Sequence, residues 1–286
     1  MITSIICTTP FGGTTTLSLD PTQSPYIVKN IDGLGPVSAN IARTSYVTKD
    51  GSIFQNARTG DRNIVLTLGL NADYSTTDDP YGELRRGLYP VFYPQSEVKL
   101  VIASTSMETV EITGWVESLE PTIFSKDPDV RISIICPDPY FVSQVDVVDT
   151  RNGAGQLIID NPGNVETGLT ILVDVFTTPS VPLEIQRLGV SPMSMYYRGG
   201  MYAQGSPLSL WFNTRQGLKS AKMGFPASGT SYSNILNTFV GNDVLGNVDN
   251  WLTVLPGQNT FNLVDAGFVG YTLHFSTAFR PKYLGM

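Results

Sequence analysis

Hydrophobic and polar residues alternate along many stretches of the chain, with the period expected where one face of a β-strand is buried. In residues 62–70, RNIVLTLGL, every second residue from Ile64 onward is isoleucine or leucine. Residues 130–136, VRISIIC, alternate in the same way and end before Pro137, which cannot donate to a strand ladder. Both segments are therefore predicted to be strands with one core-facing side. Further strands are predicted at 97–103, 109–117, 156–160, 168–176, 183–188, 207–213, 219–225, 260–263 and 270–276.

A long β-hairpin is predicted within residues 37–70. Lys49-Asp50-Gly51-Ser52 contains an Asp-Gly turn, the strongest short-range hairpin signal in a sequence. Loosely alternating residues precede this turn, and the regular strand at 62–70 follows it. We therefore expect an extended β-excursion that reverses direction near the Asp-Gly pair.

One short helix is predicted directly after this excursion. Asp79 is a suitable N-cap, and Pro80 suits the first helical position. Leu84 and Leu88 fall on one helical face, and Pro90 ends the pattern. No other segment carries a comparable combination of cap and periodicity.

The second half of the chain predicts a β-sandwich. Residues 150–155, TRNGAG, are polar and glycine-rich, as is typical of a domain boundary. Beyond them, short strands recur with turn signals between them, at the spacing typical of a sandwich. We predict a mainly all-β protein with domains at 1–142 and 143–286. The first is expected to be a sandwich or barrel-like domain that carries the long hairpin and the helix.

Composition narrows the function classes. Hydrophobic residues are 41 % of the 286 and charged residues 15 %, which excludes a disordered chain and a coiled coil. The formal net charge of −7 argues against nucleic-acid binding, because phosphate contacts need clustered lysine and arginine. The start, MITSIIC, lacks the features of a signal peptide, and no apolar run reaches about 18 residues, so no transmembrane helix is expected.

The candidate chemistry is sparse. Cys7 and Cys136 are too few for a disulfide framework and fit a reducing compartment, although a single bridge stays open. The one histidine, His274, falls in a strand-like stretch, where a structural residue is the more common interpretation. Residues 242–250 are rich in oxygen ligands but lack the glycine and glutamate of an EF-hand. Asp78-Asp79 is better explained as a helix cap than as a carboxylate pair. We therefore predict no catalytic residue, no metal site and no cofactor.

The three tryptophans leave two interpretations open. Trp115, Trp211 and Trp251 are far apart in the sequence. An exposed tryptophan could stack on a sugar ring in a lectin-like sandwich, whereas a tryptophan in the core is more common.

Several segments, taken in order, carry a family resemblance. Residues 31–36 (IDGLGP) precede the Asp-Gly turn and the strand GDRNIVLTL at 60–68, and the helix with Arg85 follows. Next come ISIICPDPYF at 132–141, NPG at 161–163, and Trp251 with LPGQNTF at 255–261. This series resembles the distal tail proteins of long-tailed, non-contractile bacteriophages.

The resemblance implies a non-enzymatic structural protein of the virion, made in the host cytoplasm and located at the tail tip. Six copies would form a ring that acts as a hub, and its central opening would let DNA pass at ejection. The implied partners are the tail tube protein, the tape-measure protein and the tail-associated hub or receptor-binding proteins. The C-terminal domain would be a galectin-like sandwich. No sequence-specific nucleic-acid binding and no membrane contact are implied.

Within that expectation, the hairpin at 48–62 is the predicted contact between ring subunits, because it could reach a neighbour and add strands to its sheet. A simple exposed hairpin is the alternative. The candidate interface residues are Lys49, Asp50, Gly51, Ile53, Phe54, Arg58 and Arg62.

Two rival functions remain. The first is a carbohydrate-binding adhesion module that recognises host cell-wall polysaccharide through the C-terminal sandwich. The second is an enzyme such as a wall hydrolase, for which the sequence offers no motif.

Overall fold

β-Strands dominate the computed structural model, which describes residues 2–123, 125–175, 183–189, 192–197, 208–224, 232–236, 239–243, 251–264 and 273–286. The prediction of a mainly all-β protein is confirmed. The chain forms two units, one running to Gln144 and including Tyr283–Met286, the other covering Val145–Lys282. The last four residues therefore return to the unit that contains the N-terminus.

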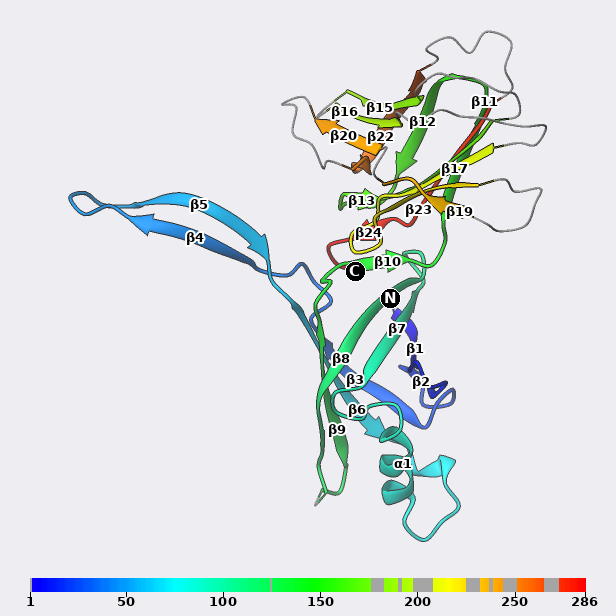
Figure 1. The fold of residues 1–286 in the computed structure, drawn as a ribbon. Helices are drawn as coiled ribbons and strands as arrows, with labels where there is room; N and C mark the ends of the chain where they lie inside the picture. The colour runs from blue at the N-terminus through cyan, green and yellow to red at the C-terminus, as the bar shows by residue number, and fades with distance from the viewer. Residues whose placement is uncertain are drawn as a thin grey trace. The chain divides into compact units, whose positions relative to one another are not determined.

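The first unit is built on a closed, barrel-like sheet of seven strands (Figure 1). Their order is β8-β7-β1-β2-β3-β6-β9, and β9 pairs back to β8. The short strands β10 and β24 extend this sheet from β8. The bounds are β1 (Ile2–Thr8), β2 (Thr14–Ser18), β3 (Tyr26–Asp32), β6 (Arg62–Leu70), β7 (Glu97–Ser104), β8 (Val110–Pro121), β9 (Asp129–Cys136), β10 (Phe141–Ser143) and β24 (Lys282–Tyr283).

The core of this unit follows the alternation in the sequence. The register of β6 and β9 places Leu66 opposite Ile132 and Ile64 opposite Ile134, and all four side chains are fully buried. Cys136, at the end of β9, is buried on the same face. The two predicted strands are therefore confirmed, with their aliphatic faces directed into the barrel.

One α-helix, α1 (Pro80–Leu88), follows the 3-10 turn η1 (Ala72–Tyr74). The Asp79 side chain accepts a hydrogen bond from the Gly82 amide at 3.0 Å, as predicted for the N-cap. Leu84 and Leu88 are buried, and the Tyr26 hydroxyl donates to the Leu84 carbonyl at 3.0 Å. This bond ties the helix to the barrel. None of the helices that the structure describes is long and apolar enough to cross a membrane.

The second unit contains two main sheets that share one core. The first has the order β11-β23-β14-β17-β18-β19, and the second β12-β22-β15-β16-β20. Ile171 and Phe275 from the first sheet pack in one cluster with Ile159 and Phe261 from the second. This arrangement is a β-sandwich. The bounds are β11 (Val147–Asn152), β12 (Gly155–Asn161), β14 (Thr170–Val175), β15 (Leu183–Leu188), β16 (Met193–Tyr197), β17 (Leu208–Asn213), β18 (Ser220–Gly224), β19 (Tyr232–Asn234), β20 (Phe239–Asp243), β22 (Gly257–Val264) and β23 (Leu273–Phe279), with a small pair β13 (Thr167–Gly168) and β21 (Thr253–Val254).

Candidate assembly interface

The predicted hairpin forms a separate two-stranded ribbon on the first unit. β4 (Ala39–Ser45) and β5 (Ser52–Thr59) pair only with each other among the described strands. Every residue of both strands is exposed. Figure 1 shows the ribbon extending away from the barrel. An isolated hairpin is marginally stable in water at best, so an external partner would stabilise this one.

The turn of the hairpin lies at the predicted place but is longer than a two-residue turn. Strand pairing ends at Ser45 and Ser52, and the Tyr46 amide donates to the Gly51 carbonyl at 3.4 Å. Gly51 has a φ of +102°, a conformation that a residue with a Cβ rarely adopts. The Lys49 ammonium lies 5.1 Å from the centre of the Tyr46 ring.

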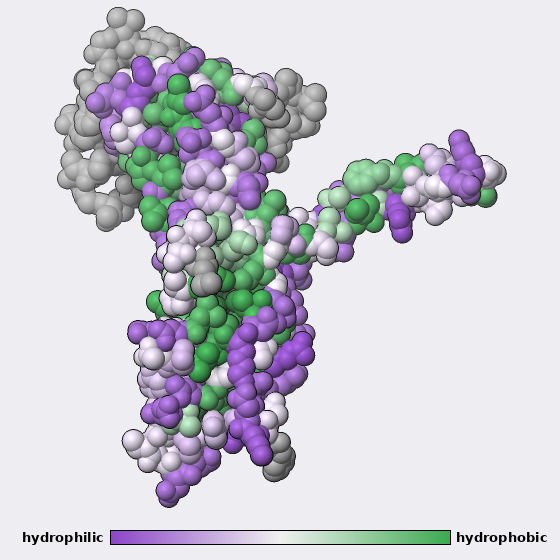
Figure 2. Space-filling model, turned by 180° about the vertical axis from the view of Figure 1, so that it is seen from behind, coloured by the Kyte–Doolittle hydropathy of each residue, from purple (hydrophilic) through white to green (hydrophobic). Residues whose placement is uncertain are grey.

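The ribbon exposes large apolar side chains. Ile41, Ile53 and Phe54 are 60 %, 50 % and 64 % exposed, and Val47 in the turn is fully exposed. The register pairs Ile41 with Ala57 and Arg43 with Phe54. Figure 2 shows hydrophobic surface along the extended arm. Apolar groups gathered on an unsupported ribbon are typical of a protein-interaction surface.

The structure brings six of the seven predicted interface residues together on this ribbon. Lys49, Asp50 and Gly51 lie in the turn, and Ile53, Phe54 and Arg58 lie on β5. Arg62 is different, because it begins β6 and is only 2 % exposed. Its side chain faces the interior of its own unit.

Arg62 holds the base of the hairpin in place. Its guanidinium donates to the carbonyls of Gly35 at 2.7 Å, Pro139 at 2.6 Å and Leu284 at 2.6 Å. It also donates to the Gly33 carbonyl, and it lies 4.4 Å from the centre of the Phe141 ring. Burial lowers the pKa of this guanidinium from its ordinary value. The charge is compensated by carbonyl oxygens and an aromatic face.

Two further contacts stabilise the base of the hairpin. The Tyr140 hydroxyl bonds to the Thr59 hydroxyl at 3.3 Å, next to the end of β5. The Met286 amide donates to the Leu34 carbonyl at 3.0 Å, so the C-terminal tail lies against the segment that leads into β4. The segments 31–36, 60–68 and 132–141, which carry the family resemblance, therefore meet at the hairpin base.

We call the contacts of the Arg62 guanidinium with these carbonyls and with Phe141 the Arg62 clamp. The sequence analysis did not predict this clamp, although the sequence contains a signal for it. Arg62 is in phase with Ile64, Leu66 and Leu68, so the alternation that predicts the core face also places Arg62 on it. A charged residue on the core face of a strand needs buried partners. Its partners are backbone carbonyls, which leave no trace in a sequence.

Two buried thiols and one histidine are among the other candidate groups that the structure describes. Cys7 and Cys136 are both free and buried, so they form no bridge with each other. His274 lies in β23, and its Nδ1 is 3.7 Å from Asp174 Oδ2, whose carboxylate also accepts from the Ser209 hydroxyl. The Asp174 carboxylate thus lies between Ser209 and His274, whereas in a Ser-His-Asp triad the histidine lies between the other two residues. Within the described residues, no group of three potential metal ligands occurs, and most of the oxygen-rich segment at 242–250 lies outside them.

The tryptophans are placed differently from one another. Trp115 is 43 % exposed on β8, whereas Trp211 and Trp251 are partly buried in the second unit. The Lys222 ammonium lies 5.0 Å from the Trp211 ring centre, and the Lys219 ammonium 5.9 Å from that of Trp251. A lysine therefore occupies one face of each of these two rings.

Part of the chain matches a known family. Residues 19–158, which include the hairpin and most of the barrel, match the model of the phage tail protein RIFT-related domain family. No curated protein matches the chain.

Solved structures add a particular likeness. The fold is similar to that of the phage SPP1 Dit protein, a hub of the adsorption apparatus in phages that infect Gram-positive bacteria. The TM-score is 0.66 at 11 % identity, over 96 % of this chain and 98 % of that one. A chain of the phage P2 baseplate also matches, at a TM-score of 0.45 and 9 % identity over 96 % of this chain and 98 % of that one, which is too low to support a conclusion.

Proposed function

We propose that the chain is a structural subunit of a phage tail tip, that it assembles into a hexameric ring, and that the β4–β5 hairpin makes the contact between neighbours. The observation that carries this proposal is the exposed two-stranded ribbon with Ile41, Ile53 and Phe54 on its surface. A barrel that is closed on itself has no need of this ribbon for its own sheet. The match of residues 19–158 to a tail-protein family model supports the same conclusion.

The clamp at Arg62 fits this role. A contact between subunits is weakened by every degree of freedom that must be lost on assembly. Arg62, Tyr140 and the C-terminal tail fix the base of the ribbon, so its direction is set before a neighbour binds. Pre-organisation of this kind raises affinity without any additional contact.

In the assembled tail, the ring would join the tail tube and tape-measure proteins to the hub or receptor-binding proteins. DNA would pass through its central opening. A net charge of −7 on each copy disfavours retention of a passing polyanion. We propose no catalytic function for the chain, and place it at the tail tip of the virion after synthesis in the host cytoplasm.

Deletion of Lys49–Gln55 tests the ring proposal. The wild-type chain is expected to give a mass near six times 31.1 kDa by multi-angle light scattering, with six-fold views by negative-stain microscopy. The deletion is expected to give a monomer, and circular dichroism would show that the barrel is intact. An unchanged ring after deletion, or a wild-type chain that stays monomeric at high concentration, would overturn the proposal.

A matched pair of surface variants removes the concern that the deletion disturbs folding. Ile53→Ser with Phe54→Ser removes apolar area from the ribbon. Val148→Ser with Ile158→Ser removes similarly exposed side chains, at 57 % and 56 %, from the second unit. Only the first pair should dissociate the ring.

A further inference from the structure

The barrel is weakest between β2 and β3. These two strands are parallel and joined by a single register pair, Ser18 with Ile27. Every other junction of the barrel is antiparallel and contains at least five register pairs. The backbone ladder is therefore almost interrupted here.

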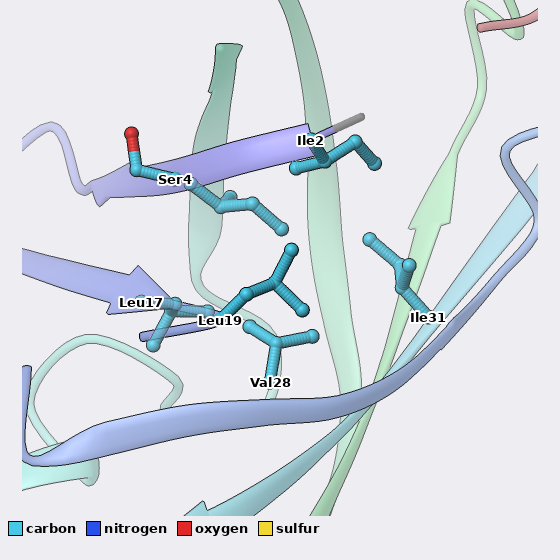
Figure 3. A pocket seen from close by; sticks show the side chains of 7 residues that line it. Ile2, Ser4, Leu17, Leu19, Val28 and Ile31 are labelled. Atoms are coloured by element: carbon cyan, nitrogen blue, oxygen red, sulfur yellow. The ribbon is translucent and has the colours of Figure 1, made fainter. Parts of the chain in front are cut away.

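An apolar hollow lies at this junction (Figure 3). Its volume is about 40 Å³, and its lining is aliphatic except for Ser4. Leu19, which directly follows β2, is 45 % exposed, whereas Leu17 is fully buried, so the hollow opens to the surface on the Leu19 side. A cavity of about 150 Å³ holds benzene, so this one admits one or two methyl groups and no aromatic ring. The lining residues are Ile2, Ser4, Ile5, Leu17, Leu19, Val28 and Ile31.

The hairpin tip has the chemistry that fits this hollow. Val47 is fully exposed in the turn, and Ile53, near the start of β5, is half-exposed, so both offer branched aliphatic groups of the right size. Phe54 is too large for the hollow and would lie on its rim.

The hairpin and the rest of the chain carry opposite net charges. Residues 39–59 contain three cations (Arg43, Lys49 and Arg58) and one anion, which is a net charge of +2. Subtracting these from 18 and 25 leaves 15 cations and 24 anions, a net charge of −9, on the rest of the chain. Two exposed carboxylates, Asp20 and Asp32, directly follow Leu19 and Ile31 of the hollow. A second copy of the chain is therefore the occupant that the charges favour.

The positions of the two features suit a ring. In Figure 1 the hairpin extends from one side of the barrel, and β1 and β2 lie at the opposite side. A contact between two different surfaces on opposite sides of one subunit is heterologous, and repeated rotation can close it into a ring. A hairpin cannot reach the hollow of its own barrel in this arrangement.

We infer that the hollow between β1, β2 and β3 is the acceptor site for the hairpin tip of a neighbouring copy, with Val47 or Ile53 entering it. This inference rests on the proposed ring and names the surface that receives the hairpin. It assigns Leu19, Val28 and Ile31 a role in assembly in addition to packing.

Chemical cross-linking tests the inference directly. Both native cysteines are buried, so introduced thiols should react selectively with a short bismaleimide. Val47→Cys with Leu19→Cys should give a ladder of covalent oligomers up to the hexamer on denaturing gels, and each single variant should give none. Val47→Cys with Tyr93→Cys is the control, because Tyr93 is 62 % exposed and lies outside the hollow.

A substitution of Leu19, on the open side of the hollow, tests the inference independently through the protein concentration at which the ring forms. Leu19→Lys places a cation in the hollow and should raise the protein concentration needed for ring formation by about tenfold or more. Leu19→Met should leave it unchanged. Phe11→Lys, at a side chain 97 % exposed in the β1–β2 turn, is the matched control and should also have no effect.

The outcomes separate the two proposals. If deletion of the hairpin dissolves the ring, but Leu19→Lys does not and the Val47–Leu19 pair gives no ladder, the hollow is not the acceptor and the ring proposal stands. If the wild-type chain forms no ring and the variant with Val47→Cys and Leu19→Cys gives no ladder, both proposals are overturned.

Discussion

Replacement of Arg62 by alanine should destabilise the first unit severely. Arg62 is 2 % exposed and donates to four carbonyls that belong to three separate segments of the chain. Alanine removes every one of these bonds together with the contact on Phe141. The loop before β4, the segment after β9 and the C-terminal tail then lose their common partner.

The magnitude follows from the surroundings of each acceptor. Pro139 is buried, so the loss of its charge-assisted bond costs about 2 kcal/mol. Gly33 and Gly35 are exposed and Leu284 is 36 % exposed, so water can replace the guanidinium there at about 0.5 kcal/mol each. Loss of the cation–π contact adds about 0.5–1 kcal/mol, for a total of about 4 kcal/mol.

Urea unfolding provides the assay. Trp115 is the one tryptophan in residues 1–144, so a Trp211→Phe, Trp251→Phe background reports on the first unit. Arg62→Ala should lower its midpoint strongly, and Arg62→Lys should recover little, because an ammonium cannot reproduce the planar fork. Arg58→Ala, on the exposed ribbon, is the control and should change stability by less than about 0.5 kcal/mol. A loss below about 1 kcal/mol for Arg62→Ala would refute the clamp.

Two further predictions concern the glycine at the hairpin base and the buried thiols. Gly33 has a φ of +89°, and a Cβ there would lie 2.0 Å from the Asn63 carbonyl oxygen. Gly33→Ala should therefore cost more than about 3 kcal/mol in thermal unfolding, whereas Gly12→Ala, with a φ of +86° and nothing within 4 Å, should cost about 1 kcal/mol. A similar cost for both would show that the close approach of Asn63 is unimportant. Burial raises the pKa of Cys136 from 9.0 to about 12 and also raises that of Cys7. Between pH 9 and 12 the two thiols hold more protons in the folded chain than in the unfolded chain, so their contribution to stability should be constant below about pH 9 and fall as pH rises above it. Cys136→Ala should flatten this fall, and a thiol reagent at pH 8 should label neither cysteine before urea is added.

Local features of the fold were accessible from the sequence. The strands at 62–70 and 130–136, the cap at Asp79 and the hairpin turn depend on residues within a few positions of each other. Their signals in the sequence are periodicity, capping chemistry and the Asp-Gly pair of the turn. The structure places each of them where the sequence predicts it.

The assembly surface was only partly accessible. Alternation and the Asp-Gly turn predict a hairpin, but not that both of its strands lack any other partner. The role of Arg62 depends on carbonyls up to 222 positions away, and such partners have no side-chain signature. The hollow beside Leu19 arises because β2 and β3 share one register pair, which no local pattern encodes.

By itself, the sequence determined the all-β class, the helix and its cap, the position of the hairpin and the faces of the main strands, because these follow from short-range periodicity. Only the tertiary structure decided that seven strands close into a barrel, that Tyr283–Met286 return to the first unit, and that Arg62 is a buried clamp. Those features depend on which distant segments contact each other. The packing of the whole chain determines these contacts, because the same local patterns are compatible with several different strand pairings.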